Sequence, residues 1–206
     1  MHYRDRLMPP CFLVWYLLFS VWMADAPVDP QFWMLANVLP VCLVGFLAAT
    51  YRTFPLSNLS YGLITLFLTL HTIGAHYTYA QVPVGYWVET ALALSRNPFD
   101  RVVHFSFGLL LTYPLFEVLI RFLSLSGFVS YYVSVMTPLG LSGLWEILES
   151  WVAQTVSPEQ GIEYLGSQGD IWDAQQDIAA ALYGALLCLL ITMTIRKILQ
   201  RDAQPL

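Results

Sequence analysis

The sequence predicts an all-α integral membrane protein: one membrane domain, residues 1–206, folded as a bundle of six transmembrane helices. Composition is the first reason, because 57% of the residues are hydrophobic and 11% are charged, whereas soluble domains carry about 25% charged residues. A net charge of −5 without a polybasic segment also excludes a nucleic-acid binder. The other reasons are six apolar stretches of spanning length and an uneven distribution of basic residues.

The six apolar stretches are taken in chain order. A spanning helix needs about 20 mostly apolar residues, and each stretch would extend roughly 27 Å at about 1.5 Å per residue. Pro27 and Pro30 follow the first stretch, and Arg52 and Pro55 follow the second. Long connections precede the fourth and sixth stretches, where we expect short interfacial helices in the outer loops. The expected spans are residues 7–24, 32–49, 56–73, 102–120, 128–145 and 178–195.

The basic residues predict the orientation of the bundle. Cytoplasmic loops of membrane proteins carry an excess of Lys and Arg. With both termini in the cytoplasm, only Arg96 and Arg101 lie outside. The basic residues then placed inside are Arg4, Arg6, Arg52, Arg121, Arg196, Lys197 and Arg201.

The first stretch also has features of a secretory signal peptide. Basic residues precede it and Ala24-Asp25-Ala26 follows it, as at an A-x-A cleavage site. The stretch itself contains Trp15, Tyr16 and Trp22, which is unusually aromatic for a signal peptide. We therefore expect an uncleaved anchor; cleavage would remove one span without inverting the other five.

Ionisable residues gather at the outer ends of spans three to six. A charged residue at the centre of a membrane helix costs about 2.5–3.5 kcal/mol on insertion scales, so such residues indicate function. Spacings of three and four residues place side chains on one helical face. The groups with this spacing are Asp100 with His104, Glu146 with Glu149, and Asp170, Asp173 and Asp177.

Three histidines, His71, His76 and His104, are candidate ligands of a divalent metal. His71 and His76 both point inward only if the helix ends between them, which Gly74 allows. Asp100, Glu146 or Asp173 would complete the ligand set. Histidine and carboxylate ligands without thiolates suit Zn, Mn or Fe; whether any cofactor is bound stays open.

Each of these features also has a purely structural explanation. An isolated membrane histidine is more often a hydrogen-bonded packing residue than a ligand, and acids at a helix start often cap it. Glu117 and Arg121 have the spacing of a structural ion pair. The gathered carboxylates would nevertheless repel one another. A divalent cation, protonated histidines, Arg101 or a cationic ligand would offset that repulsion.

Four strings of the sequence resemble the YjdF-type family of bacterial inner-membrane proteins. The resemblance implies a multi-pass protein of the bacterial inner membrane but no particular reaction. The strings are HTIGAHYTYA (71–80), RNPFDRVVHFSFGLLL (96–111), LWEILE (144–149) and YLGSQGDIWDAQQD (164–177).

A more distant resemblance, over about residues 100–184, is to VanZ-like membrane proteins linked to teicoplanin resistance. Their pattern is D-x-x-x-H, then E-x-x-Q, then D-x-x-D-x-x-x-N-x-x-G. This chain has Glu149 in place of Gln, Asp177 in place of Asn and Ala180 in place of Gly. These departures make the site more acidic. The shared element would be a polar cluster facing the outer leaflet.

Three functions are compatible with this pattern. The first is an enzyme acting at the periplasmic face on a lipid or lipid-linked envelope substrate, by metal-assisted or acid–base chemistry. The second is a non-catalytic module that binds lipid or a partner protein, and the third is a proton-coupled transporter. The oligomeric state stays open. In the first case His104, Asp100, Glu146, Asp173 and Asp177 would be catalytic, and Arg101, Glu149 and Asp170 would bind substrate.

Overall fold

A computed structural model describes residues 8–202, and within them the chain is helical without any strand. The predicted all-α class is therefore confirmed. The helices are α1 (Met8–Met23), α2 (Pro30–Ala36), α3 (Val38–Thr50), α4 (Asn58–His76), α5 (Pro83–Leu92), α6 (Phe99–Arg121), α7 (Gly127–Ala153), α8 (Pro158–Leu165) and α9 (Asp173–Asp202).

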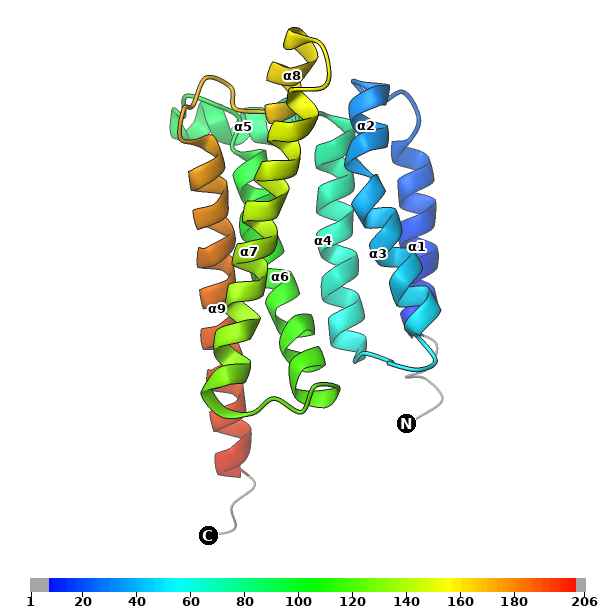
Figure 1. The fold of residues 1–206 in the computed structure, drawn as a ribbon, viewed down its shortest axis with the longest axis vertical. Coiled ribbons are helices and arrows are strands. Elements are labelled where there is room, and N and C mark those ends of the chain that lie inside the picture. Colours follow the sequence, from blue (N-terminus) through cyan, green and yellow to red (C-terminus); the bar gives the residue numbers. More distant parts are fainter. Residues whose placement is uncertain (1–7, 203–206) are drawn as a thin grey trace.

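The long helices form one bundle whose members run alternately up and down in the view of Figure 1. Helix α6 is central, because it packs against α4, α7 and α9, while α1 packs on the far side of α4. The short helices α5 and α8 lie together with α2 at one end of the bundle. We call this end the α5–α8 end.

The outer surface of the bundle is apolar. Within the described residues, three segments are long and apolar enough to cross a membrane, namely Pro30–Thr50, Phe99–Arg121 and Asp173–Leu199, and α1 is a shorter apolar helix. Large apolar side chains are well exposed, as at Phe128 (78%). Such a surface suits lipid as the surrounding solvent. Six spans and their orientation stay predictions, and Arg4, Arg6 and Leu7 lie outside the described residues.

The expected second span is broken into two helices. Helix α2 ends at Ala36 and α3 begins at Val38, with Asn37 between them at φ −88° and ψ −2°. Pro40 explains the break, because it lacks the N–H that would bond to the Ala36 carbonyl. At this break the side-chain amide of Asn37 donates a hydrogen bond to the Trp33 carbonyl at 2.8 Å. At the other end of α2, Asp29 caps the helix by accepting from two backbone N–H groups.

Other helices extend beyond the apolar windows from which they were predicted. The fourth span starts at Phe99 instead of residue 102, and the fifth continues to Ala153 instead of ending near 145. The sixth starts at Asp173 instead of residue 178. The apolar windows stop at the first polar residues, but the backbone continues as helix, and several of those polar side chains are buried inside the bundle. The candidate acids therefore project from helices.

Small residues bring α6 and α9 into close contact. A Cβ atom added at Gly108 would overlap the Ala181 carbonyl oxygen, and one added at Gly184 would overlap the Phe105 carbonyl oxygen. Ala181 and Ala185 are fully buried. Small residues of this kind let two membrane helices approach until their backbones touch. The contact holds the acidic first turns of α9 beside the start of α6.

Adding a methyl group at this contact will destabilise the fold. We expect Gly108→Ala and Gly184→Ala to lower the free energy of unfolding by about 1–3 kcal/mol, since overpacking forces backbone shifts. Gly140→Ala is the matched control, because a Cβ there meets nothing within 4 Å. Thermal unfolding of the detergent-solubilised variants measures the effect. Equal midpoints for all three variants would contradict the close packing.

Candidate functional site

Two loops at the α5–α8 end are tied together by hydrogen bonds. The Asn97 N–H donates to Gln168 Oε1 at 2.9 Å, and the Gln168 side-chain amide donates to Asn97 O at 3.1 Å. The Asn97 amide also donates to Val82 O at 3.0 Å. These bonds connect the segment before α6 to the segment before α9. The start of each helix is thereby placed relative to the other.

Two arginines pair with the acids of α9 and its preceding loop. Arg96 is 6% exposed and is paired with Asp173, while its second Nη donates to Gly166 O at 3.1 Å. Arg101 is paired with Asp170 and lies 3.7 Å from Asp173. The Trp172 N–H bonds to Asp170, and this bond together with Arg101 lowers the pKa of the Asp170 carboxyl.

His104, on α6, lies between carboxylates of two helices. Its Nε2 is 3.3 Å from Glu146 Oε1 on α7 and 3.8 Å from Asp100 Oδ1 one turn earlier on α6. Its Nδ1 is hydrogen-bonded to Ser142 Oγ at 3.0 Å. Ser142 precedes Glu146 by one helical turn, so α7 holds both ring nitrogens of this buried imidazole.

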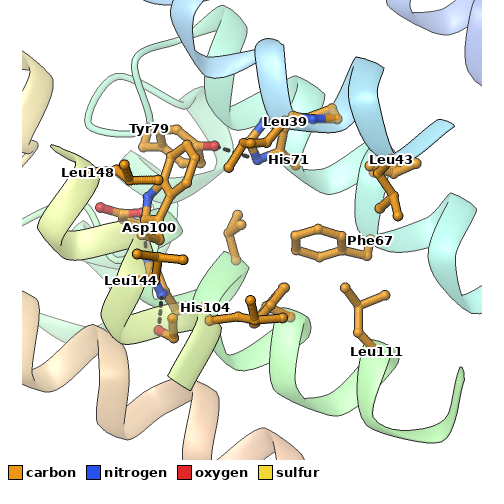
Figure 2. Close-up of a pocket in the computed structure, with 17 residues that line it drawn as sticks. Leu39, Leu43, Phe67, His71, Tyr79, Asp100, His104, Leu111, Leu144 and Leu148 are labelled. Carbon is orange, nitrogen blue, oxygen red and sulfur yellow. Dashed lines mark hydrogen bonds and ion pairs between the residues drawn. The ribbon is translucent and has the colours of Figure 1, made fainter. Parts of the chain in front are cut away.

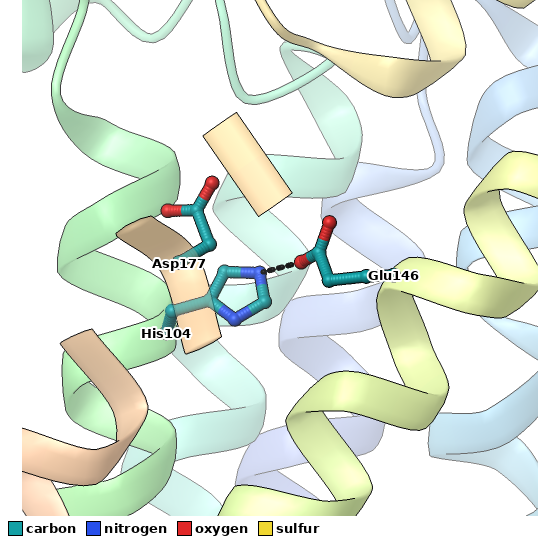
Figure 3. A group of neighbouring side chains, drawn as sticks. All are labelled: His104, Glu146 and Asp177. Atoms are coloured by element: carbon teal, nitrogen blue, oxygen red, sulfur yellow. Dashed lines mark ion pairs between the residues drawn. The ribbon is translucent and has the colours of Figure 1, made fainter. Parts of the chain in front are cut away.

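Asp177 completes the cluster from α9. It is 1% exposed, and its Oδ1 has no hydrogen-bond partner among the described residues; the same holds for Glu146 Oε1. Figure 3 shows both carboxylates on the same side of the His104 ring. Two groups of three ligand atoms lie within 4.8 Å of one another, namely His104, Glu146 and Asp177, and Asp100, Asp173 and Asp177. Their chemistry fits a divalent cation.

Glu149 is buried beside two tyrosines. Burial, together with the neighbouring Glu149 carboxyl, raises the pKa of Tyr164 to about 12. Burial also raises the pKa of Tyr79 well above its ordinary value, with Asp100 and Glu149 adding to the effect. Both hydroxyls therefore stay protonated at neutral pH, and that of Tyr79 donates to His71.

His71 lies next to the cluster, but both of its ring nitrogens are engaged. Its Nε2 donates to the Ala36 carbonyl at 3.1 Å, the group that Pro40 leaves without a helical partner. Its Nδ1 accepts from the Tyr79 hydroxyl at 2.8 Å. Gly74 makes room for this arrangement, because a Cβ at that position would overlap the Tyr79 ring. His71 is placed as a packing residue.

His76 lies away from the cluster. Helix α4 continues through this residue instead of ending near Gly74, so His71 and His76 point in different directions. The His76 Nδ1 donates to Met23 O at 2.7 Å, at the last turn of α1. The expected metal set of three histidines is therefore not assembled, since neither His71 nor His76 belongs to the two ligand groups.

An apolar cavity of about 320 Å³ leads to the cluster. Figure 2 shows Phe67, Leu43 and Leu111 on one side of it, and Asp100 and His104 on the other. The cavity is lined by α3, α4, α6 and α7, together with Tyr79. Its other lining residues include Leu39, Pro40, Leu68, His71, Val103, Phe107, Leu141, Ser142, Leu144, Trp145 and Leu148.

The structure brings most of the expected site residues together. The residues gathered there are Asp100, Arg101, His104, Glu146, Glu149, Asp170, Asp173 and Asp177. Sequence reasoning missed the roles of Arg96, Ser142 and Tyr79. Two of these residues could have been found from their spacing to a candidate acid. Ser142 precedes Glu146 by four residues, and Arg96 precedes Asp100 by four.

A helical membrane protein with a buried histidine–carboxylate cluster is the class that this fold and site define. The chain belongs to the predicted membrane protein family DUF2238, whose model matches residues 8–198. The inner membrane protein YjdF of Escherichia coli (strain K12) is 39% identical over 161 residues, covering 77% of this chain and 76% of YjdF. The YjdF-type resemblance is thus confirmed. No solved structure matches the chain significantly.

Removing Arg96 will unfold the site. We expect Arg96→Ala to lower the free energy of unfolding by about 3–5 kcal/mol, because it leaves the buried Asp173 carboxylate without its partner. Arg52→Ala is the control, since Arg52 is exposed and forms no ion pair within residues 8–202. Denaturation in mixed micelles measures both variants. A loss of equal size at Arg52 would show that the Arg96 ion pair is unimportant.

Proposed function

We propose that this chain is a six-span protein of the bacterial inner membrane that acts on a lipid or lipid-linked envelope substrate at its periplasmic face. The single observation that carries the proposal is the continuity of the apolar cavity with the buried cluster around His104. The cavity is apolar along its length and polar at the end near His104, and a lipid matches it because it has an apolar chain and a polar group.

The proposed orientation puts the α5–α8 end in the periplasm and both termini in the cytoplasm. Arg52 and Arg121 follow α3 and end α6, at the opposite end of the bundle in Figure 1. Arg96 and Arg101, at the α5–α8 end, are both paired with acids. The opposite end also carries Arg196 and Lys197 near the end of α9, so the excess of Lys and Arg favours it as the cytoplasmic one. The inner-membrane name of YjdF supports the location.

The cavity has the position and opening that a lipid chain requires. Leu39 on α3 and Leu144 on α7 both line it, yet they are 48% and 46% exposed, so it opens sideways between these helices. Along α6 its lining runs from Asp100 to Leu111, about 16 Å of helix. That length is close to half of the roughly 30 Å hydrocarbon core. We infer that one acyl or isoprenyl chain of the outer leaflet occupies it.

The cluster at the polar end of the cavity supplies acid–base groups. His104 faces Glu146 and Asp100, and an imidazole held by carboxylates is a common general base. Without a metal, His104 would accept the proton and Glu146 would orient its imidazole; with a metal bound, His104 would be a ligand instead. Arg101, Glu149 and Asp170, which lie in the same cluster, would bind the polar group of the substrate.

We propose that the resemblance to VanZ-like proteins extends to the same site. The residues that carry it are Asp100, His104, Glu146 and the Asp170, Asp173 and Asp177 stripe, which the fold gathers at one end. We propose that both kinds of protein use this polar cluster toward the outer leaflet.

The alternative is a non-catalytic lipid-binding module in which the cluster only clasps helix ends together. The ion pairs of Arg96 and Arg101 favour it, because they join the start of α6 to the start of α9. A proton-coupled transporter has less support. The deeper acid, Glu117, is paired with Arg121 and accepts from the Ser57 N–H and hydroxyl, both at 2.8 Å. These contacts make it a structural connection between α4 and α6.

Blocking the cavity will remove a bound lipid. We expect native mass spectrometry to find one lipid per chain in the purified protein and a several-fold lower occupancy in Leu43→Trp, because the indole fills the cavity. Val41→Trp is the matched control on the same helix, since Val41 is 65% exposed and does not line the cavity. Equal occupancy in the two variants would refute the lipid site.

The state of the bound lipid will separate catalysis from binding alone. We expect wild-type protein to carry product or a mixture of substrate and product, and His104→Ala to carry substrate alone. The mass difference between the two lipids identifies the bond that changes. Identical lipid masses, with a lower thermal stability of His104→Ala, would instead support the non-catalytic alternative, in which the cluster only stabilises the helix ends.

A further inference from the structure

We infer that His104, Glu146 and Asp177 form a binding site for one divalent cation of the Mn²⁺ or Zn²⁺ type. The three residues come from α6, α7 and α9, so the site joins three helices at one point. This inference deepens the proposed function, on which it rests, by naming the group that would act at the polar end of the cavity.

One pair of ligand atoms has the separation that a metal ion requires, and the third ligand lies close to both. Metal–ligand bonds of about 2.0–2.2 Å place neighbouring donor atoms roughly 3.0–3.5 Å apart. His104 Nε2 and Glu146 Oε1 are 3.3 Å apart, and Asp177 offers an oxygen within 4.8 Å of both. One imidazole and two carboxylates form a mixed nitrogen–oxygen set with open positions for solvent or substrate, which favours Mn²⁺ or Zn²⁺ over Ca²⁺.

Two of the three ligand atoms are buried acceptors without a hydrogen-bond donor. Asp177 Oδ1 has none within the described part of the chain although the side chain is 98% buried, and Glu146 Oε1 has none either. Both oxygens face the same space above the His104 ring in Figure 3. Unsatisfied buried acceptors are costly and require an explanation. A cation between them satisfies both at once.

The second ligand group does not make an equivalent site. It consists of Asp100, Asp173 and Asp177, but Asp173 is paired with Arg96 and lies 3.7 Å from Arg101. A guanidinium therefore already occupies the place where a cation would bind that carboxylate. Arg101 Nε also lies 4.0 Å from Asp177 Oδ1, which is beyond hydrogen-bond distance. The arginines therefore bond directly to Asp173 and Asp170, and they leave the ligand atoms around His104 without a guanidinium hydrogen bond.

The groups around His104 have the arrangement expected behind a metal ligand. Metal-binding histidines commonly use their second ring nitrogen in a hydrogen bond that fixes the ring orientation. His104 Nδ1 makes such a bond to Ser142 Oγ at 3.0 Å, which turns Nε2 toward Glu146. His104 and Ser142 also line the cavity, so an ion bound there would be within reach of the polar group of a bound lipid.

The charge of the cluster also favours a cation. The cluster around His104 contains six acids and two arginines, so its formal charge with all acids ionised is 2 − 6 = −4. A divalent cation would reduce it to −2. The six acids are Asp100, Glu146, Glu149, Asp170, Asp173 and Asp177.

Metal titration of the purified full chain tests the inference. After chelator treatment, calorimetric titration with MnCl₂ or ZnCl₂ is expected to find one ion per chain. Asp177→Asn and Glu146→Gln should each raise the dissociation constant at least tenfold, since each replaces an anionic ligand by a neutral one of the same size. Asp170→Asn is the matched control and should change it less than twofold, because Asp170 lies in the same layer but in neither ligand group.

A spectroscopic measurement identifies the histidine ligand independently of stability. Mn²⁺ bound to the wild-type chain should show an electron spin-echo modulation from one imidazole nitrogen, and His104→Ala should lose it. The inference is overturned if neither ion binds, if Asp170→Asn weakens binding as much as Asp177→Asn, or if the nitrogen modulation persists in His104→Ala. Lipid retention by Val41→Trp and Leu43→Trp is measured separately. Lipid binding without metal would overturn this inference alone, and metal without lipid would overturn the proposed function alone.

Discussion

Carboxylates buried within a membrane protein need counter-charges or hydrogen-bond donors, and this requirement organises the α5–α8 end of the bundle. Arg96 meets it for Asp173, and Arg101 meets it for Asp170. Both arginines belong to the segment that enters α6, whereas both acids belong to the segment that enters α9. The same pairs that neutralise charge therefore hold the two helix starts together. Helix packing through Gly108 can then continue along the length of both helices.

A second series of hydrogen bonds starts at Pro40, which lacks a backbone N–H donor. Pro40 leaves the Ala36 carbonyl without a helical partner, and His71 donates to it. The other nitrogen of His71 accepts from Tyr79, which closes the cavity beneath the outer loops. This sequence of contacts makes His71 part of the cavity wall. His104 differs because its Nε2 faces only carboxylates, so it is the histidine from which chemistry at this site would start.

The two proposals describe adjoining parts of one space. The apolar part of the cavity lies between helices that leave Leu39 and Leu144 open to lipid, and its polar part contains His104. A cation held by His104, Glu146 and Asp177 would polarise an oxygen of the bound polar group or activate water. Without a cation, the same residues form an acid–base pair with a hydrogen-bonding wall. In both proposals the lipid chain would position the substrate and the cluster would act on it.

The amino-acid sequence by itself determined that this is a membrane protein of the all-helical class and that its polar residues gather at one end of the helices, because hydropathy and helical period are local properties. It also identified Asp100, His104 and Glu146, since their spacing places them on helix faces. It could not determine that His71 and His76 serve other helices, because their partners are the backbone carbonyls of Ala36 and Met23, far away in the chain. Only the tertiary structure decided which acid meets which arginine, since such pairing depends on helix packing, which no local pattern encodes.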